Sequence, residues 1–138
     1  MRLLAFIVLL AAFGCGAGVS ASSAGSTSVT ELKISYWSQG RDEGSATKWI
    51  LRCEPAGGTL PLAASACRKL KAMTSPFAPI PKDAVCTDLY GGPQVALITG
   101  NYRGRTIWVQ LRNRNGCEIT RFRKLAFLVP TFGAAGDS

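Results

Sequence analysis

The sequence predicts an α+β domain in which an antiparallel sheet carries a helix on one face. Several segments alternate apolar and polar side chains with a period of two, as strands with one buried face do. Another segment repeats apolar residues at helical spacing. Four cysteines fall among these segments of the 138-residue chain, which predicts disulfide bonds in an exported domain.

The first two strands are expected at residues 30–37 and 47–53. In the first of them, Glu31, Lys33 and Ser35 alternate with apolar side chains. A polar, glycine-containing turn at residues 40–44 lies between the two segments. This order predicts a β-hairpin.

A helix is expected over residues 61–73, because Pro61 suits a first helical position and four apolar side chains recur at helical spacing. These are Leu62, Ala66, Leu70 and Met73. The proline-rich residues 74–82 predict an irregular connection. Strands at residues 95–99, 105–112 and 125–132 complete the order β-β-α-β-β-β. The pairs Gly57-Gly58 and Gly91-Gly92 are interpreted as turns.

The N-terminus has the pattern of an export signal. Arg2 precedes eleven apolar residues, too few for a membrane-spanning helix of about 20 residues. Residues 12–15, Ala-Phe-Gly-Cys, resemble a bacterial lipobox, which implies a signal peptide of the lipoprotein type at residues 1–14 and a diacylglyceryl group on Cys15. The alternative is an ordinary secretory signal cut after Ala21, which would remove Cys15.

The rest of the chain divides by composition. Residues 15–28 are rich in Gly, Ala, Ser and Thr and predict a flexible tether. Residues 29–133 form the expected domain, and residues 134–138 a short tail. Either kind of signal predicts an extracellular or cell-surface location, and a lipid on Cys15 would attach the protein to a membrane.

Three motifs carry a family resemblance. They are the spacing of Cys53, Cys67, Cys86 and Cys117, the stretch Cys-Glu-Pro-Ala-Gly-Gly-Thr-Leu-Pro at residues 53–61, and Tyr-Arg-Gly-Arg at residues 102–105. Over residues 32–132 the chain resembles the Streptomyces subtilisin inhibitor-like family of serine protease inhibitors. The resemblance implies a two-layer fold with a five-stranded antiparallel sheet, two helices, two disulfides and often a homodimer formed by sheet packing. It also implies the pairs Cys53–Cys67 and Cys86–Cys117, whereas the sequence alone leaves three connectivities for four cysteines.

The same resemblance implies a reactive-site loop and a serine endopeptidase as partner. The loop consists of Val85, Cys86, Thr87, Asp88, Leu89 and Tyr90, with the scissile bond between Asp88 and Leu89. It would enter the protease cleft as an extended strand. The disulfide at Cys86 would hold it in that form, so that little ordering entropy is lost on binding.

Two departures from the family pattern leave the target open. Family members commonly have an apolar or basic residue where Asp88 stands, and burying a carboxylate in an apolar pocket is costly. An acid-specific protease with a basic pocket would instead pair with Asp88. The Gly91-Gly92-Pro93 bend also appears one residue longer than in the family. If this shifts the register, Leu89 becomes the specificity residue and suits a subtilisin-like pocket.

Charge supports a competing function. The chain has a net charge of +8. Basic side chains gather in its last third: Arg103, Arg105, Arg112, Arg114, Arg121, Arg123 and Lys124. The scaffold could therefore be a non-inhibitory surface protein that binds an anionic partner, or the arginines could simply occupy a solvated face. Nucleic acid is not expected as a partner of an exported protein.

The composition argues against an enzyme. The chain has no histidine, which excludes a Ser-His-Asp triad and the usual zinc sites. With four cysteines assigned to bridges, no thiol nucleophile is left in the domain. We therefore expect no catalytic residue, metal or cofactor, and a protease inhibitor is the favoured interpretation.

Overall fold

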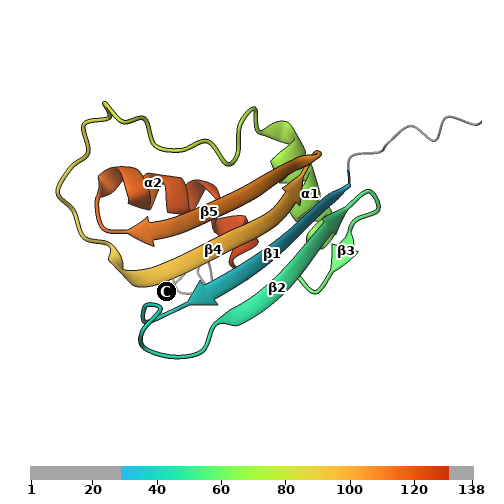
Figure 1. Ribbon diagram of the computed structural model, residues 1–138, viewed down its shortest axis with the longest axis horizontal. Helices are drawn as coiled ribbons and strands as arrows, with labels where there is room; N and C mark the ends of the chain where they lie inside the picture. The colour runs from blue at the N-terminus through green and yellow to red at the C-terminus, as the bar shows by residue number, and fades with distance from the viewer. Residues whose placement is uncertain (1–28, 131–138) are drawn as a thin grey trace, which may run out of the picture.

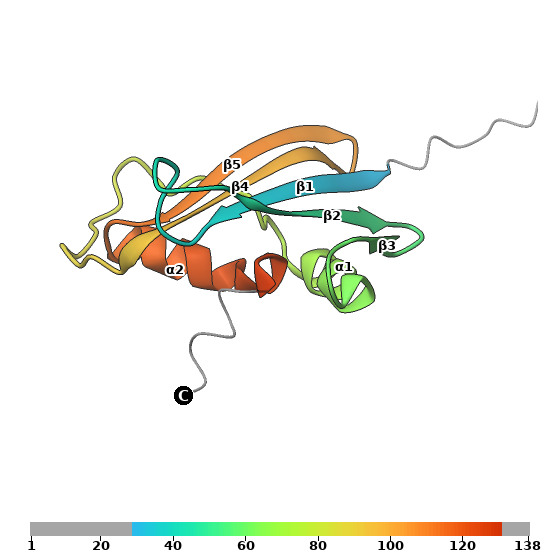
Figure 2. The ribbon, with the colours of Figure 1, turned by 90° about the horizontal axis from the view of Figure 1, so that it is seen from below.

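The computed structural model describes residues 29–130, which form one sheet with two helices on one of its faces (Figure 1). The strands are β1 (Thr30–Trp37), β2 (Thr47–Cys53), β3 (Gly57–Gly58), β4 (Gly92–Tyr102) and β5 (Arg105–Asn113). The helices are α1 (Ala63–Ala72) and α2 (Gly116–Lys124), followed by a 3-10 turn at Ala126–Leu128. The sheet is antiparallel with the order β3-β2-β1-β4-β5. Seen edge-on, the sheet and the helices make two layers (Figure 2), so the predicted two-layer fold is confirmed.

Four predictions lie outside the described residues. They concern the signal peptide at residues 1–14, the tether at residues 15–28, the lipid on Cys15 and the tail at residues 134–138. Within residues 29–130, no helix has the length and apolar character needed to cross a membrane.

The core lies between the sheet and the two helices. In β1, Leu32, Ile34 and Tyr36 face inward, as the alternating pattern predicts. Ile34 stands opposite Trp49 on one side and Ile98 on the other. Leu70 of α1 and Phe122 of α2 close the core from the helical side, and both are buried. The central position of β1 therefore follows from its long run of alternating apolar residues.

The strands at residues 30–37 and 47–53 are confirmed, and the two later strands are longer than expected. β4 covers Gly92–Tyr102 rather than residues 95–99, and β5 ends at Asn113. The helix expected at residues 61–73 begins at Ala63, because Leu62 has a left-handed backbone (φ 54°) that cannot continue a helix. Residues 74–82 lack regular helix and strand, as their prolines predict.

The strand predicted at residues 125–132 is wrong. Leu125 follows α2, and Ala126–Leu128 form the 3-10 turn. Leu125, Leu128 and Val129 are buried among the core residues. A short apolar run has the same appearance in a buried turn and in a buried strand, so periodicity could not separate the two.

The helix α2 is missing from the order that the residue pattern predicted, and only the family resemblance implied a second helix. Its buried side chains are Ile119 and Phe122. Two apolar positions among charged residues give a weak helical period. The apolar pattern was therefore too weak to predict this helix, although the predicted fold class was correct.

The interpretation of Gly57-Gly58 as a turn is also wrong, because the two residues form β3 and pair with Leu51 and Arg52 of β2. At Gly58 the backbone has φ +104°, and a Cβ there would overlap the carbonyl oxygen of Ile50. Only glycine fits this close approach. Gly92 likewise opens β4 rather than a turn.

Candidate functional site

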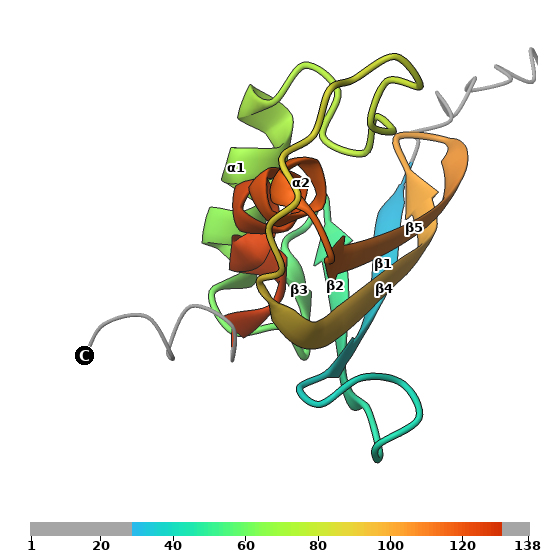
Figure 3. The same cartoon turned by 90° about the vertical axis from the view of Figure 1, so that its left-hand side faces the viewer.

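The predicted reactive-site residues lie on one exposed loop at the end of the sheet where β4 begins and β5 ends. Residues 84–91 have no regular secondary structure, and the loop passes α2 before it enters β4 (Figure 3). The side chain of Val85 is 100% exposed, that of Leu89 57% and that of Tyr90 67%. Three large apolar side chains that are exposed to solvent on one loop indicate a surface that contacts a partner.

The first half of the loop is fixed to the first turn of α2. A disulfide joins Cys86 to Cys117, with 5.3 Å between their Cα atoms. One residue later, the Gly116 N–H donates to the carbonyl oxygen of Thr87 at 3.0 Å. The Thr87 side chain lies against Gly116 so closely that a Cβ on Gly116 would overlap Thr87 Oγ1. The loop therefore has three contacts with α2 within two residues.

The second half of the loop is fixed to the end of β5. The Gly91 N–H donates to the carbonyl oxygen of Asn113 at 2.7 Å. A Cβ on Gly91 would lie 2.8 Å from Cδ1 of Ile119 and 3.2 Å from Cβ of Asn113, so a side chain at position 91 would require Ile119 to move. Both ends of the segment between Thr87 and Gly91 are thus attached to the junction of β5 and α2.

In this unbound form the tip between these anchors is a tight turn, and not the extended strand that the resemblance implied for the loop in a protease cleft. The Leu89 N–H donates to the carbonyl oxygen of Thr87 at 2.9 Å, so the hydrogen bond encloses Asp88 alone. Asp88, Leu89 and Tyr90 are all exposed. The loop therefore presents a peptide bond and its flanking side chains to solvent while its backbone is held on both sides.

Comparison with known protein families decides the affiliation. The subtilisin inhibitor-like family model matches residues 26–115. The chain belongs to the subtilisin inhibitor-like family. No curated protein sequence matches it. The family is one of protease inhibitors, and both disulfides that the resemblance implied, Cys53–Cys67 and Cys86–Cys117, are present.

The structure brings Val85, Cys86, Thr87, Asp88, Leu89 and Tyr90 together on one loop. The assignment of the scissile bond to Asp88 and Leu89 stays a prediction, and so does the homodimer. Sequence reasoning missed the residues that hold the loop, which are Gly91, Asn113 and Gly116.

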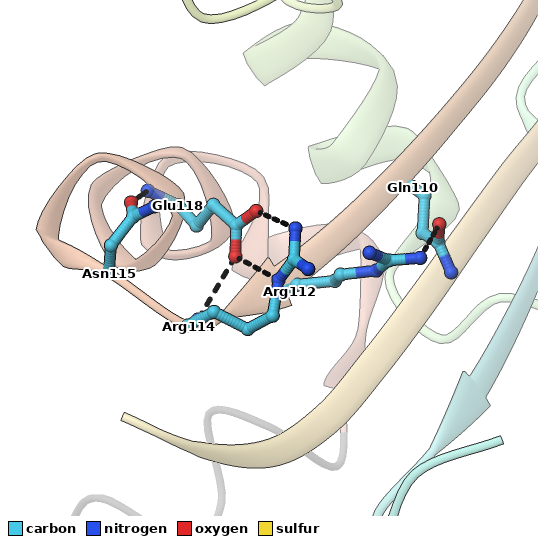
Figure 4. Close-up of polar contacts among 5 residues, drawn as sticks. All are labelled: Gln110, Arg112, Arg114, Asn115 and Glu118. Carbon is cyan, nitrogen blue, oxygen red and sulfur yellow. Dashed lines mark hydrogen bonds and ion pairs between the residues drawn. The ribbon is translucent and has the colours of Figure 1, made fainter. Parts of the chain in front are cut away.

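A network of polar contacts fixes the start of α2, where the loop is attached. Asn115 caps the helix by accepting a hydrogen bond from the Glu118 N–H at 3.0 Å. Glu118 in turn accepts from the backbone N–H of Arg114 at 3.0 Å and from its guanidinium, with 2.8 Å between Nη2 and Oε1 (Figure 4). Such reciprocal bonds satisfy donors that a helix start leaves unpaired. The signal for them was in the sequence, because Asn115 is followed three residues later by Glu118.

The charge of Glu118 depends on this contact. Hydrogen bonding from Arg114 lowers the pKa of Glu118 and outweighs the opposite effect of partial burial. The same pair raises the pKa of Arg114. Both shifts favour the ionised pair, so the cap is strongest when Glu118 is deprotonated.

The basic residues of the last third do not form one face. Arg103 and Arg105 lie at the turn between β4 and β5, whereas Arg112 and Arg114 lie at the opposite end of β5. Arg121 is half-buried and donates from Nη2 to the carbonyl oxygen of Phe77 at 3.3 Å. This distribution weakens the argument for one broad anion-binding surface.

The hydrogen bonds between Glu118 and Arg114 at the start of α2 predict that the free energy of unfolding depends on pH. Because folding lowers the pKa of Glu118, its contact with Arg114 stabilises the folded protein fully above the unfolded pKa of about 4.3. This stabilisation is lost as the pH falls through the pKa of Glu118 in the folded protein. Glu118→Gln should lower the free energy of unfolding by about 1 kcal/mol at neutral pH. Urea titrations from neutral pH to about pH 3 should show this difference shrinking. Glu43→Gln, at an exposed loop position, is the control, and a constant difference would contradict the cap's role.

The contact between Gly116 and Thr87 gives a second prediction. Gly116→Ala should displace the Thr87 side chain, because the new Cβ would overlap Thr87 Oγ1, and should weaken protease binding by up to about tenfold. The helix itself tolerates alanine well. Adding Thr87→Ala removes Oγ1 and leaves the Thr87 Cβ at 3.4 Å, so the double variant should recover much of the lost affinity. Inhibition constants of the three proteins check this, and equal losses in the single and double variants would refute it.

Proposed function

We propose that this domain inhibits a serine endopeptidase by presenting Val85–Tyr90 as a substrate-like loop. One observation carries the proposal: a loop with exposed apolar side chains is tied on both sides to the junction of β5 and α2. An exposed loop that is free to move is a protease substrate, whereas one that is held on both sides loses less ordering entropy on binding and can act as an inhibitor. Membership of a protease inhibitor family agrees with this.

The anchors suggest how attack would be reversed. The protease serine would add to the carbonyl carbon of Asp88, and the amine of Leu89 would leave as an acyl-enzyme forms. Gly91, bonded to Asn113, keeps the new amine near the ester. Thr87, bonded to Gly116, keeps the acyl side in place. The amine would then attack the ester faster than water does, and the original peptide bond would form again.

The tight turn at the tip favours Asp88 over Leu89 as the specificity residue. Because the Thr87–Leu89 hydrogen bond encloses only Asp88, this side chain stands at the apex of the loop. A protease with a basic pocket would pair with its carboxylate. An apolar pocket would have to desolvate the same charge without a partner, which costs several kcal/mol, on the order of several decades of affinity. An acid-specific endopeptidase is therefore the better fit.

The proposal includes export and attachment to a membrane through Cys15. The two disulfides support an oxidising compartment. Mass spectrometry of the mature N-terminus should find an acylated Cys15, and Cys15→Ser should move the protein from the membrane fraction to the medium or block its processing. A mature chain that begins at Ser22 in both proteins would instead establish ordinary secretion.

The specificity assignment gives a sharp prediction. Asp88→Leu should lower the inhibition constant for a subtilisin-like enzyme by about two decades, since a desolvated carboxylate is replaced by an apolar side chain, and should abolish inhibition of an acid-specific enzyme. Titration of both enzymes with the purified oxidised domain measures this. Asp83→Leu is the matched control, because Asp83 is also exposed but precedes the loop.

Other outcomes would redirect the proposal. If Leu89→Ala alone removes inhibition and Asp88→Leu changes nothing, Leu89 is the specificity residue. If the wild-type domain slows no serine protease and is simply cleaved, the inhibitory function is refuted. The non-inhibitory surface protein that binds an anionic partner would then be favoured.

A further inference from the structure

A pocket of about 310 Å³ lies beside the leaving side of the loop. Its walls come from the loop between β1 and β2, the start of β4 and the end of β5. Tyr90, two residues beyond Asp88, forms part of its lining. The β1–β2 loop lies close to the start of β4, since a Cβ on Gly40 would lie 3.6 Å from the carbonyl oxygen of Pro93. The pocket is therefore built from three segments and directly adjoins the proposed reactive site.

The charged side chains that line this pocket are mostly cationic. Arg41, Arg112 and Arg114 contribute three guanidinium groups, and Asp42 contributes the one carboxylate of the lining. Glu118 already neutralises Arg114. The remaining balance is two guanidinium groups against one carboxylate, so the pocket has a net positive charge.

Neither Arg41 nor Arg112 is matched by a carboxylate. Arg112 runs along β5 away from Arg114 and donates from Nη2 to Oε1 of Gln110 at 2.5 Å, a neutral acceptor (Figure 4). The guanidinium carbon of Arg41 lies 5.0 Å from the centre of the Trp37 ring. Within residues 29–130, the ion pairs are Arg52–Glu31 and Arg114–Glu118, and neither includes these two arginines. The interaction between Glu118 and Arg112 is an electrostatic attraction without a hydrogen bond.

Two buried polar atoms at the same wall also lack partners. Nε2 of Gln110 and Oδ1 of Asn113 are inaccessible to solvent and make no hydrogen bond. Asn113 is 2% exposed and its amide nitrogen donates only to Gln94. Buried polar atoms without partners are rare in folded proteins. The Arg112 guanidinium, which donates to Oε1 of Gln110, is a planar group whose N–H donors match the two oxygens of a carboxylate.

We propose that this pocket is a second contact for the target protease and receives a carboxylate from the rim of its leaving-side cleft. The inference rests on the proposed inhibitory function, because a cleft that holds Leu89 and Tyr90 passes beside the pocket. It also specifies the partner further: the enzyme has a basic specificity pocket for Asp88 and an acidic rim for Arg41 and Arg112. Opposite charges at two neighbouring points fix orientation and accelerate encounter.

The test uses the double variant Arg41→Gln/Arg112→Gln in the full oxidised domain. Its association rate constant with the inhibited protease should fall about tenfold at about 0.02 M salt, and the difference should shrink at about 0.3 M salt because ions screen the attraction. The matched control is Arg103→Gln/Arg105→Gln, which removes the same charge at the far end of β5. The thermal unfolding midpoint shows whether either variant disturbs the fold. A double-mutant cycle with single neutralised carboxylates on the protease rim identifies the partner group.

The possible outcomes distinguish a failure of this inference from a failure of the proposed inhibitory function. Equal slowing by the control variant means that net charge acts alone, and it overturns the inference. An unchanged association rate with intact inhibition also overturns it, while the inhibitory function stands. If the wild-type domain inhibits no protease, both fail together. Coupling between Arg112 and one rim carboxylate, absent with Arg105, supports the assignment.

Discussion

Both sides of the reactive-site loop depend on one short junction, where β5 ends and α2 begins. Asn113 accepts the hydrogen bond of Gly91, Gly116 donates to Thr87, and Cys117 forms the disulfide with Cys86. Three residues within five consecutive positions thus fix the loop from both directions. The junction is in turn held by the Asn115 cap and by β5, whose place in the sheet depends on pairing with β4. A rigid support on secondary structure keeps a binding loop in one form better than contacts within the loop itself.

This constraint explains an arrangement that would otherwise be unfavourable. Val85, Leu89 and Tyr90 expose apolar surface to water, which is unfavourable. A free loop would pack these side chains against the nearest apolar surface. The short reach between Thr87 and Gly91 prevents such a collapse. Glycine at positions 91 and 116 is part of the same arrangement, since a Cβ at either position would require the Ile119 or Thr87 side chain to shift. The small residues therefore contribute to the shape of the loop together with the disulfide.

Sequence patterns predicted the sheet well where burial alternates, and poorly where it does not. The bounds of β1 were predictable because its buried side chains alternate with more exposed ones, whereas in β2 only Leu51 is buried and the alternation of residue types gave the prediction. Residues 125–129 are buried without alternation, so their 3-10 turn could not be told from a strand. Gly57-Gly58 has no side chains to show a period, and its pairing with β2 depends on a close approach of backbones. The loop was located through family motifs, but its supports were not, because Asn113 and Gly116 act through backbone atoms and through the absence of bulk.

The disulfide between Cys86 and Cys117 has a topological consequence. The two cysteines are 31 positions apart in the chain, and the bond between Asp88 and Leu89 lies inside the covalent ring that they close. Cutting this bond would open the ring without dividing the molecule. Ordinary proteolysis gains translational entropy because one chain becomes two fragments that diffuse apart. Here the nicked form stays a single particle that differs from the intact one by one added water, so the hydrolysis equilibrium lacks the entropy that normally makes peptide cleavage irreversible.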